Sequence, residues 1–382
     1  MKFSVLFTGA LGLAASTVKA FEFHWQGVFA NGDEIVENGP SSVLFTGHPV
    51  YVTFSSVDNS VISSMGYTEG ETHCLMEHNF ISVYHSLDSE ADNAGGVSAN
   101  AARAYAFLGG KATFFGVLGD DAVADEFERN MGACGVNMKT IRRKGDLTSH
   151  KMSLITADGT STALCHLGAS DMVGPDDLNK SVMDEFDYVV FEAPMLASPD
   201  QFDFTKKLLA AAYTRGKKVI TLLFGKRCVE KGDEFVLSIV EQSAYVAGSM
   251  DAISKLYGLK GEELADLLVE KTKGVHPQHD AVIVTMGMEG ALIFLQGKVL
   301  YVPPVNSVDD SEKRVDVVDS TDADELFAGA ALYGLLNGWC AAKAAKFGST
   351  IVADVSSKFG TVIDESVRAK IDEIKNSTSD KL

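Results

Sequence analysis

Short β-rich runs alternate with stretches of helical pattern along most of the chain beyond residue 40. Alternation of this kind predicts an α/β fold, in which helices cover both faces of a mostly parallel sheet. The expected strands are Ala112–Val117, Tyr188–Glu192, Lys218–Leu223, Ala281–Thr285, Ala291–Leu295 and Val299–Val302, the last two joined through Gln296 and Gly297. The expected helices are Ala99–Leu108, Gln201–Arg215, Asp251–Lys271 and Asp324–Asn337.

Two regions, residues 50–57 and 151–166, depart from this alternation. Both are rich in strand-forming residues and have no helix between their strands. They predict a small accessory sheet beside the main one.

The N-terminus has the parts of a secretory signal peptide. A single lysine precedes an apolar run over residues 3–16, and Val18 and Ala20 are the small residues before a cleavage point. We therefore expect residues 1–20 to direct export. Phe21 after the cut also resembles the two-part presequences of complex plastids, and a first buried strand in a cytoplasmic protein is the other alternative. The remaining layout is an extension over 21–41, a globular domain over 42–376 and a tail over 377–382.

The charge balance excludes some partners. The 382 residues include 33 Lys and Arg against 52 Asp and Glu, a net charge of −19, which repels nucleic acid and anionic membrane surfaces. The apolar N-terminal run is shorter than the roughly 20 residues of a membrane span. The five cysteines form no C-x-x-C motif, so we expect core thiols rather than a disulfide framework or a metal site.

A glycine pair precedes one expected helix. Gly95 and Gly96 would let backbone amides approach a ligand closely, and Asn100 could hydrogen-bond a hydroxyl-rich substrate. Alone, such a pair more often marks a turn than a binding site.

A second motif, from Asp319 to Glu325, lies where a strand would lead into the last long helix. With it, the chain resembles the pfkB family of carbohydrate kinases, in its adenosine-kinase-like branch, from about residue 43 to the end. The first family signature is matched in spacing by Gly95, Gly96, Asn100, Gly109 and Gly119. Further matches in the family's order include Leu167–Ser170 and Thr285–Gly290.

The resemblance implies a ribokinase-like three-layer αβα core with a small β-sheet lid, and ATP-dependent phosphorylation of a sugar or nucleoside with Mg²⁺. It also implies a homodimer through the lid as one arrangement. By position in the family motifs, Gly95, Gly96 and Asn100 would hold the acceptor, and Thr285, Gly287 and Gly290 would face the nucleotide. Asp322 and Asp324 would lie at the phosphate, and Glu325 would be the catalytic base.

The second signature departs from the family's Asp-Thr-Thr-Gly-Ala-Gly-Asp. Asp322 and Asp324 replace its glycines and Glu325 replaces its catalytic aspartate. Val52 stands where the family has a substrate-binding aspartate, and residues 248–251 replace its Asn-x-x-Glu. A carboxylate about 4 Å from a phosphate repels it by roughly 4 kcal/mol at an effective dielectric near 20.

Three alternatives therefore stay open. The first is a slow kinase that uses Glu325. The second is an inactive pseudokinase whose acidic residues cap the helix and fill its anion hole, serving as a binding or assembly module. The third is a secreted protein that binds a nucleoside without chemistry. Carboxylates that hold a metal ion would favour the first.

Overall fold

The computed structural model describes residues 4–5, 21–22, 41–157, 160–196, 198–224, 233–305 and 317–377. The chain divides into two units, Met1–Ile35 and Val36–Leu382. In the first, strands β1 (Ser4–Val5) and β2 (Phe21–Glu22) pair antiparallel. The expected signal peptide and extension otherwise lie outside the described residues, so both stay predictions.

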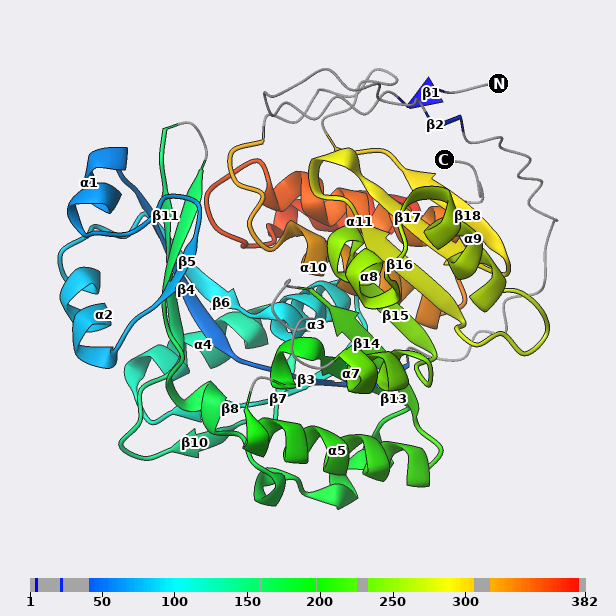
Figure 1. The fold of residues 1–382 in the computed structure, drawn as a ribbon, viewed down its shortest axis with the longest axis horizontal. Helices are drawn as coiled ribbons and strands as arrows, with labels where there is room; N and C mark the ends of the chain where they lie inside the picture. Colours follow the sequence, from blue (N-terminus) through cyan, green and yellow to red (C-terminus); the bar gives the residue numbers. More distant parts are fainter. Residues whose placement is uncertain are drawn as a thin grey trace. The chain divides into compact units, whose positions relative to one another are not determined.

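The second unit is built on a nine-stranded sheet of order β18-β17-β16-β15-β14-β13-β3-β7-β9 (Figure 1). All neighbours are parallel from β9 to β16, and β17 alone runs in the opposite direction, antiparallel to both β16 and β18. The predicted mostly parallel sheet is confirmed. Its strands are β3 (Ser42–Thr46), β7 (Lys111–Phe115), β9 (Asn137–Met138), β13 (Tyr188–Glu192), β14 (Lys218–Leu223), β15 (Tyr245–Ser249), β16 (Ala281–Thr285), β17 (Ala291–Leu295) and β18 (Lys298–Val302).

Helices cover both faces of this sheet because its strands are apolar on both sides. Val190 of β13 packs into one hydrophobic cluster, while its neighbours Val189 and Phe191 pack into another on the opposite face. The first cluster holds α3 (Val97–Phe107), α4 (Ala122–Ala133), α10 (Ala323–Leu336), α11 (Ala341–Val355) and α12 (Arg368–Asn376). The opposite face holds α5 (Pro199–Thr214), α7 (Asp233–Val240), α8 (Met250–Tyr257) and α9 (Gly261–Lys271).

The expected helix Asp251–Lys271 is wrong as a single element. It is two helices, α8 and α9, because Gly258 ends α8 in the left-handed conformation with φ 65°. The expected strand Ala112–Val117 likewise ends at Phe115, and Val117–Gly119 forms a separate strand, β8, paired with β10 (Ile141–Arg143).

The accessory sheet is present and has five strands, in the order β5-β12-β11-β4-β6. Helices α1 (Asn59–Ser64) and α2 (Glu77–Tyr84) pack on one face of it through Ile62, Phe80 and Leu164. We call these strands and the two helices the lid. The strands are β4 (Val50–Ser56), β5 (Thr72–Cys74), β6 (Ala91–Gly95), β11 (His150–Ile155) and β12 (Ser161–His166).

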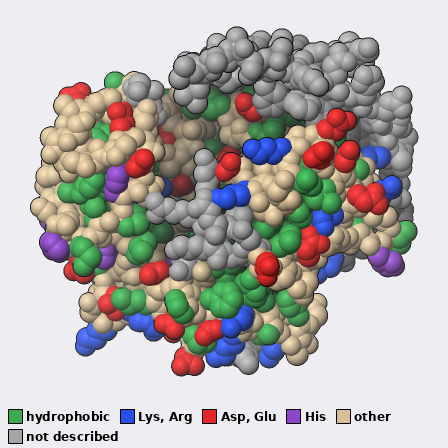
Figure 2. All heavy atoms as spheres, in the orientation of Figure 1, with side chains coloured by type: hydrophobic (Ala, Val, Ile, Leu, Met, Phe, Trp, Pro, Cys, Tyr) green, Lys and Arg blue, Asp and Glu red, His purple; other side chains and the backbone are tan. Residues whose placement is uncertain are grey.

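Negative charge is spread over the surface. Figure 2 shows acidic side chains scattered across one face, with Lys and Arg between them rather than in one basic patch. No helix within the described ranges is long and apolar enough to cross a membrane.

Candidate active site

The loop before α10 is fixed by a buried carboxylate. Asp319 accepts the Thr321 amide at 2.9 Å through Oδ1 and the Gly360 amide at 3.3 Å through Oδ2. These bonds tie the loop to the chain's C-terminal segment. The first turn of α10 is therefore presented in one conformation.

Asp322 has a backbone conformation that favours glycine. Its φ is 59° and its ψ is 9°, in the left-handed region. A side chain in this region costs about 1–2 kcal/mol, which glycine does not pay. The loop thus holds the Asp322 carboxylate in a conformation that glycine would adopt without strain.

The Asp322 carboxylate points toward the lid and Gly95. Asp322 Oδ1 lies 3.6 Å from Nζ of Lys151, on lid strand β11. Its Oδ2 is buried, has no hydrogen-bond partner, and lies 3.5 Å from where a Cβ on Gly95 would stand. The structure therefore places the Asp322 carboxylate beside Gly95 and Lys151, and its predicted role at the phosphate stays a prediction. Sequence reasoning missed Lys151, because only strand register shows which lid residues face α10.

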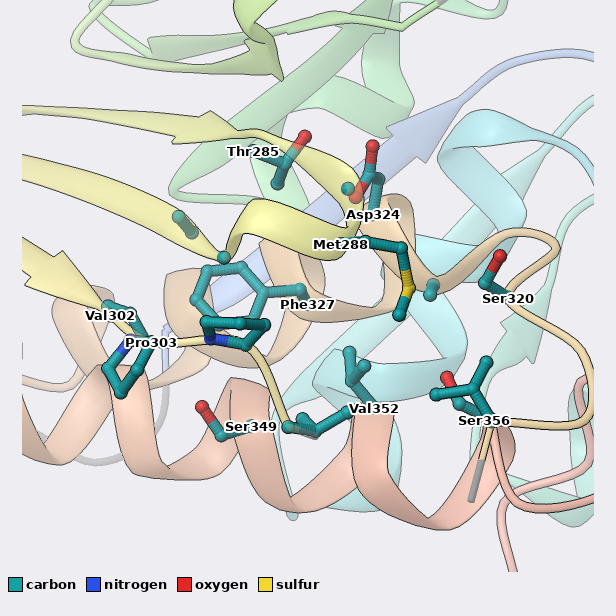
Figure 3. Close-up of a pocket in the computed structure, with 17 residues that line it drawn as sticks. Thr285, Met288, Val302, Pro303, Ser320, Asp324, Phe327, Ser349, Val352 and Ser356 are labelled. Atoms are coloured by element: carbon teal, nitrogen blue, oxygen red, sulfur yellow. The ribbon is translucent and has the colours of Figure 1, made fainter. Parts of the chain in front are cut away.

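Asp324 faces the other way, into a cavity of about 240 Å³. Figure 3 shows its carboxylate beside the Thr285 hydroxyl at one end, with Phe327 and Val352 along the apolar wall. Burial raises the pKa of Asp324. The predicted nucleotide-side residues Thr285, Gly287, Gly290 and Asp324 all line this cavity. Their role stays a prediction.

Glu325 follows in the same helical turn, and burial together with the negative charges of Asp322 and Asp324 raises the pKa of its carboxyl group. Burial, followed by the charge of Asp322, raises the pKa of Glu325 to about 8. Its own backbone amide and Lys151 act in the opposite direction. At pH 7 this carboxyl is therefore mostly protonated, and it ionises as the pH rises toward 8.

That raised pKa predicts a pH-dependent stability. Between pH 4.5 and 8 the unfolded state has released the Glu325 proton while the folded state keeps it, so the free energy of unfolding falls as pH rises. Glu325→Gln should remove this pH dependence. Between pH 5 and pH 9, the free energy of unfolding of the variant should therefore rise relative to that of the wild type by on the order of a few kcal/mol. Urea unfolding at both pH values measures it. The exposed control Glu373→Gln should follow the wild type, and parallel curves for Glu325→Gln would contradict the assignment.

The side chain of Asn100 is oriented by a hydrogen bond from a buried arginine, Arg103. Its Oδ1 accepts from Nη1 of Arg103 at 3.1 Å, and both side chains are 1% exposed. Arg103 also donates to the carbonyls of Ala94 at 2.7 Å and Thr361 at 2.5 Å. The arginine thus joins β6, α3 and the C-terminal segment. Arg103 is the one charged residue in an alanine-rich helix, and this was the feature of the sequence that could have indicated its buried structural role.

A second buried carboxylate supports the glycine pair. Glu192, at the end of β13, accepts the amides of His48 at 2.8 Å and Ser98 at 2.7 Å, and its Oε1 lies 3.0 Å from Nδ1 of His48. Gly96 has φ 108°, and a Cβ there would strike the His48 carbonyl. The turn therefore requires glycine, and Glu192 fixes the start of α3.

Nowhere in the described ranges do three or more His, Cys, Asp or Glu side chains come together in a way that could hold a metal ion. Asp322 and Asp324 point to opposite sides, which explains why the three neighbouring carboxyl groups make no such cluster.

Comparison with known proteins places the sequence among carbohydrate kinases. The model of the pfkB family carbohydrate kinases matches residues 82–367. Aminoimidazole riboside kinase of Salmonella typhimurium is 29% identical over 266 residues, 64% of this chain and 75% of that protein. Deoxyribokinase of Salmonella typhi is 26% identical over 246 residues, 62% of this chain and 72% of that protein.

Solved structures share the fold. Adenosine kinase from Sinorhizobium meliloti superposes with a TM-score of 0.75 at 22% identity, covering 88% of this chain and 99% of that one. A probable sugar kinase from Rhizobium etli gives a TM-score of 0.75 at 23% identity, with the same coverage. The architecture is ribokinase-like, as predicted. The three-quarters of the sequence that match the family model establish that this chain belongs to the pfkB family of carbohydrate kinases.

Proposed function

We propose that this protein transfers a phosphoryl group from ATP to a hydroxyl of a sugar or nucleoside, slowly, with Glu325 as the general base. The observation that carries the proposal is the placement of Glu325 in one helical turn between Asp322, on the acceptor side, and Asp324, in the cavity. A base whose pKa is raised to about 8 suits proton removal near neutral pH.

The cavity fits a nucleotide. Its wall is largely apolar, which suits a purine base, and the Thr285 hydroxyl lies at its end beside the Asp324 carboxylate. ATP would supply the phosphoryl group, with Mg²⁺ neutralising its charge. The chain's own part is to place the acceptor beside Glu325, with Lys151 offsetting the negative charge of Asp322.

The acceptor class follows from the residues at the glycine pair and from the relatives. By position in the family motif, Gly95, Gly96 and the amide side chain of Asn100 would hold a hydroxyl-rich ring, with Arg103 orienting Asn100 through its Oδ1. Two relatives are named for a riboside and for deoxyribose. A ribosyl or related sugar hydroxyl is therefore the acceptor that we propose.

The test is acceptor-dependent ADP release by the chain from Phe21 onward with Mg-ATP. The panel contains adenosine, aminoimidazole riboside, ribose, deoxyribose and fructose. Glu325→Ala should lower turnover about 10²–10⁴-fold, the usual contribution of a general base, and Glu373→Ala should not change it. The ascending limb of the kcat–pH profile should lie near pH 8. Turnover that survives in Glu325→Ala would remove Glu325 from the role.

A second candidate is an inactive module with the same fold. It is favoured by the Asp322 carboxylate beside Gly95 and by the Glu325 carboxylate directed at its own backbone amide, since both occupy places where substrate and phosphate would bind. On this reading, no acceptor in the panel yields ADP from folded protein. Nucleosides would then be tested for thermal stabilisation alone.

Export through residues 1–20 and a homodimer through the lid are also proposals. Fusion of residues 1–20 to a reporter and light scattering of the purified chain test them separately. Retention of the reporter in the cytoplasm, or a monomeric mass, would argue against each.

A further inference from the structure

Four lid residues form one row across the sheet. Cys74 of β5 pairs with Cys165 of β12, Cys165 pairs with Lys151 of β11, and Lys151 pairs with Val52 of β4. Partners in register point to the same side of a sheet. The four side chains therefore share one face.

That face is the one turned toward α10. Lys151 reaches Asp322 at 3.6 Å, and a Cβ on Gly95 would lie 2.7 Å from Cγ2 of Val52. The opposite face is occupied by α1 and α2. Both cysteines thus belong to the wall that carries Lys151.

The two sulfurs are already in contact. Cys74 Sγ lies 3.2 Å from Cys165 Sγ. Neighbouring strands are about 4.8 Å apart, inside the roughly 4.4–6.8 Å Cα separation that a disulfide needs. The expectation of core thiols is wrong for Cys74, which is exposed, and holds for Cys134, which is buried.

We propose that Cys74 and Cys165 form a reversible disulfide across β5 and β12, a modification site in the lid. With a small disulfide such as oxidised glutathione, the exposed Cys74 thiolate attacks one sulfur and releases one glutathione thiolate. Cys165, as thiolate, then attacks the mixed disulfide at the Cys74 sulfur and releases the second glutathione. Two protein thiols become one disulfide, and one glutathione disulfide becomes two thiols.

The bond would fix the weakest strand of the lid. β5 has three residues, pairs with the lid only along β12, and is the last strand at that edge. The bond lies at the final rung of this pairing, next to the Leu75 amide, which donates to the Cys165 carbonyl at 2.7 Å. The inference is independent of phosphoryl transfer.

The experiment incubates the reduced full-length chain with oxidised glutathione and then alkylates the remaining thiols under denaturing conditions. The five cysteines should yield three alkylated residues, and peptide mapping should link Cys74 to Cys165. Hydrogen exchange of the Leu75 amide should slow at least about tenfold in the oxidised protein.

Variants separate the two steps. Cys165→Ser should stop at a mixed glutathione disulfide on Cys74, while Cys134→Ser should lose two thiols as the wild type does. Five alkylated cysteines after oxidation, a linkage that involves another cysteine, or a stable glutathione adduct in the wild type would each overturn the proposal.

Discussion

Replacing Asp322 and Asp324 by glycine and Glu325 by aspartate is expected to raise acceptor-dependent ADP release by about 10²-fold or more. Two glycines would free the helix amides of carboxylates that repel the phosphate. Aspartate would move the base by about one methylene, and a displacement of ~1 Å alone can change a rate by about 10²-fold. The triple variant measures the combined effect of these departures.

Single variants show how much each substitution contributes to the expected rise in ADP release. Asp322→Gly should also stabilise the fold by about 1 kcal/mol, because glycine accepts φ 59° without strain. Lys151 loses its partner in this variant, so Asp322→Asn, which keeps the side chain's size, is the matched comparison. A folded triple variant whose turnover does not increase would show that this loop does not limit the reaction.

Removal of the buried arginine is the second large effect. Arg103→Ala should lower the free energy of unfolding by about 3–5 kcal/mol, as for other fully buried charged groups with several hydrogen bonds. The Ala94 and Thr361 carbonyls and Asn100 Oδ1 would lose their donor, and a cavity would remain. Urea unfolding measures the loss.

Two further variants make that prediction specific. Arg129→Ala removes an arginine whose side chain is 70% exposed and should change stability by less than about 0.5 kcal/mol. Arg103→Met fills most of the volume of the arginine side chain. It should therefore recover only the part of the stability loss that the cavity causes, and not the part that the missing hydrogen bonds cause. Wild-type stability in Arg103→Ala would mean that water or other groups satisfy these acceptors.

The strands of the main sheet were predictable to the residue where β-branched runs are buried on both faces. Tyr188–Glu192, Lys218–Leu223 and Ala281–Thr285 begin and end as expected. Local composition is enough to predict these strands, because their burial between neighbouring strands and two helix layers favours the same apolar, β-branched residues. The helix break at Gly258 could also have been predicted, because glycine commonly ends helices in the left-handed conformation.

The electrostatics of the site were not predictable in the same way. Lys151 and Asp322 are far apart in sequence, and their contact depends on strand register in the lid, which a single sequence does not fix. The Cys74 and Cys165 contact has the same origin. The sequence could nominate Asp322, Asp324 and Glu325, but the direction in which each side chain points required the fold.

The position of the first strands has a consequence for how the chain folds during synthesis. β3 lies inside the main sheet between β7 and β13, and β4 lies inside the lid between β6 and β11. Neither can complete its pairing until residues 150–192 have been made. Non-local pairing of this kind slows folding and leaves strand edges exposed on the ribosome. We expect nascent chains that end before residue 150 to need chaperones, whatever chemistry the finished site performs.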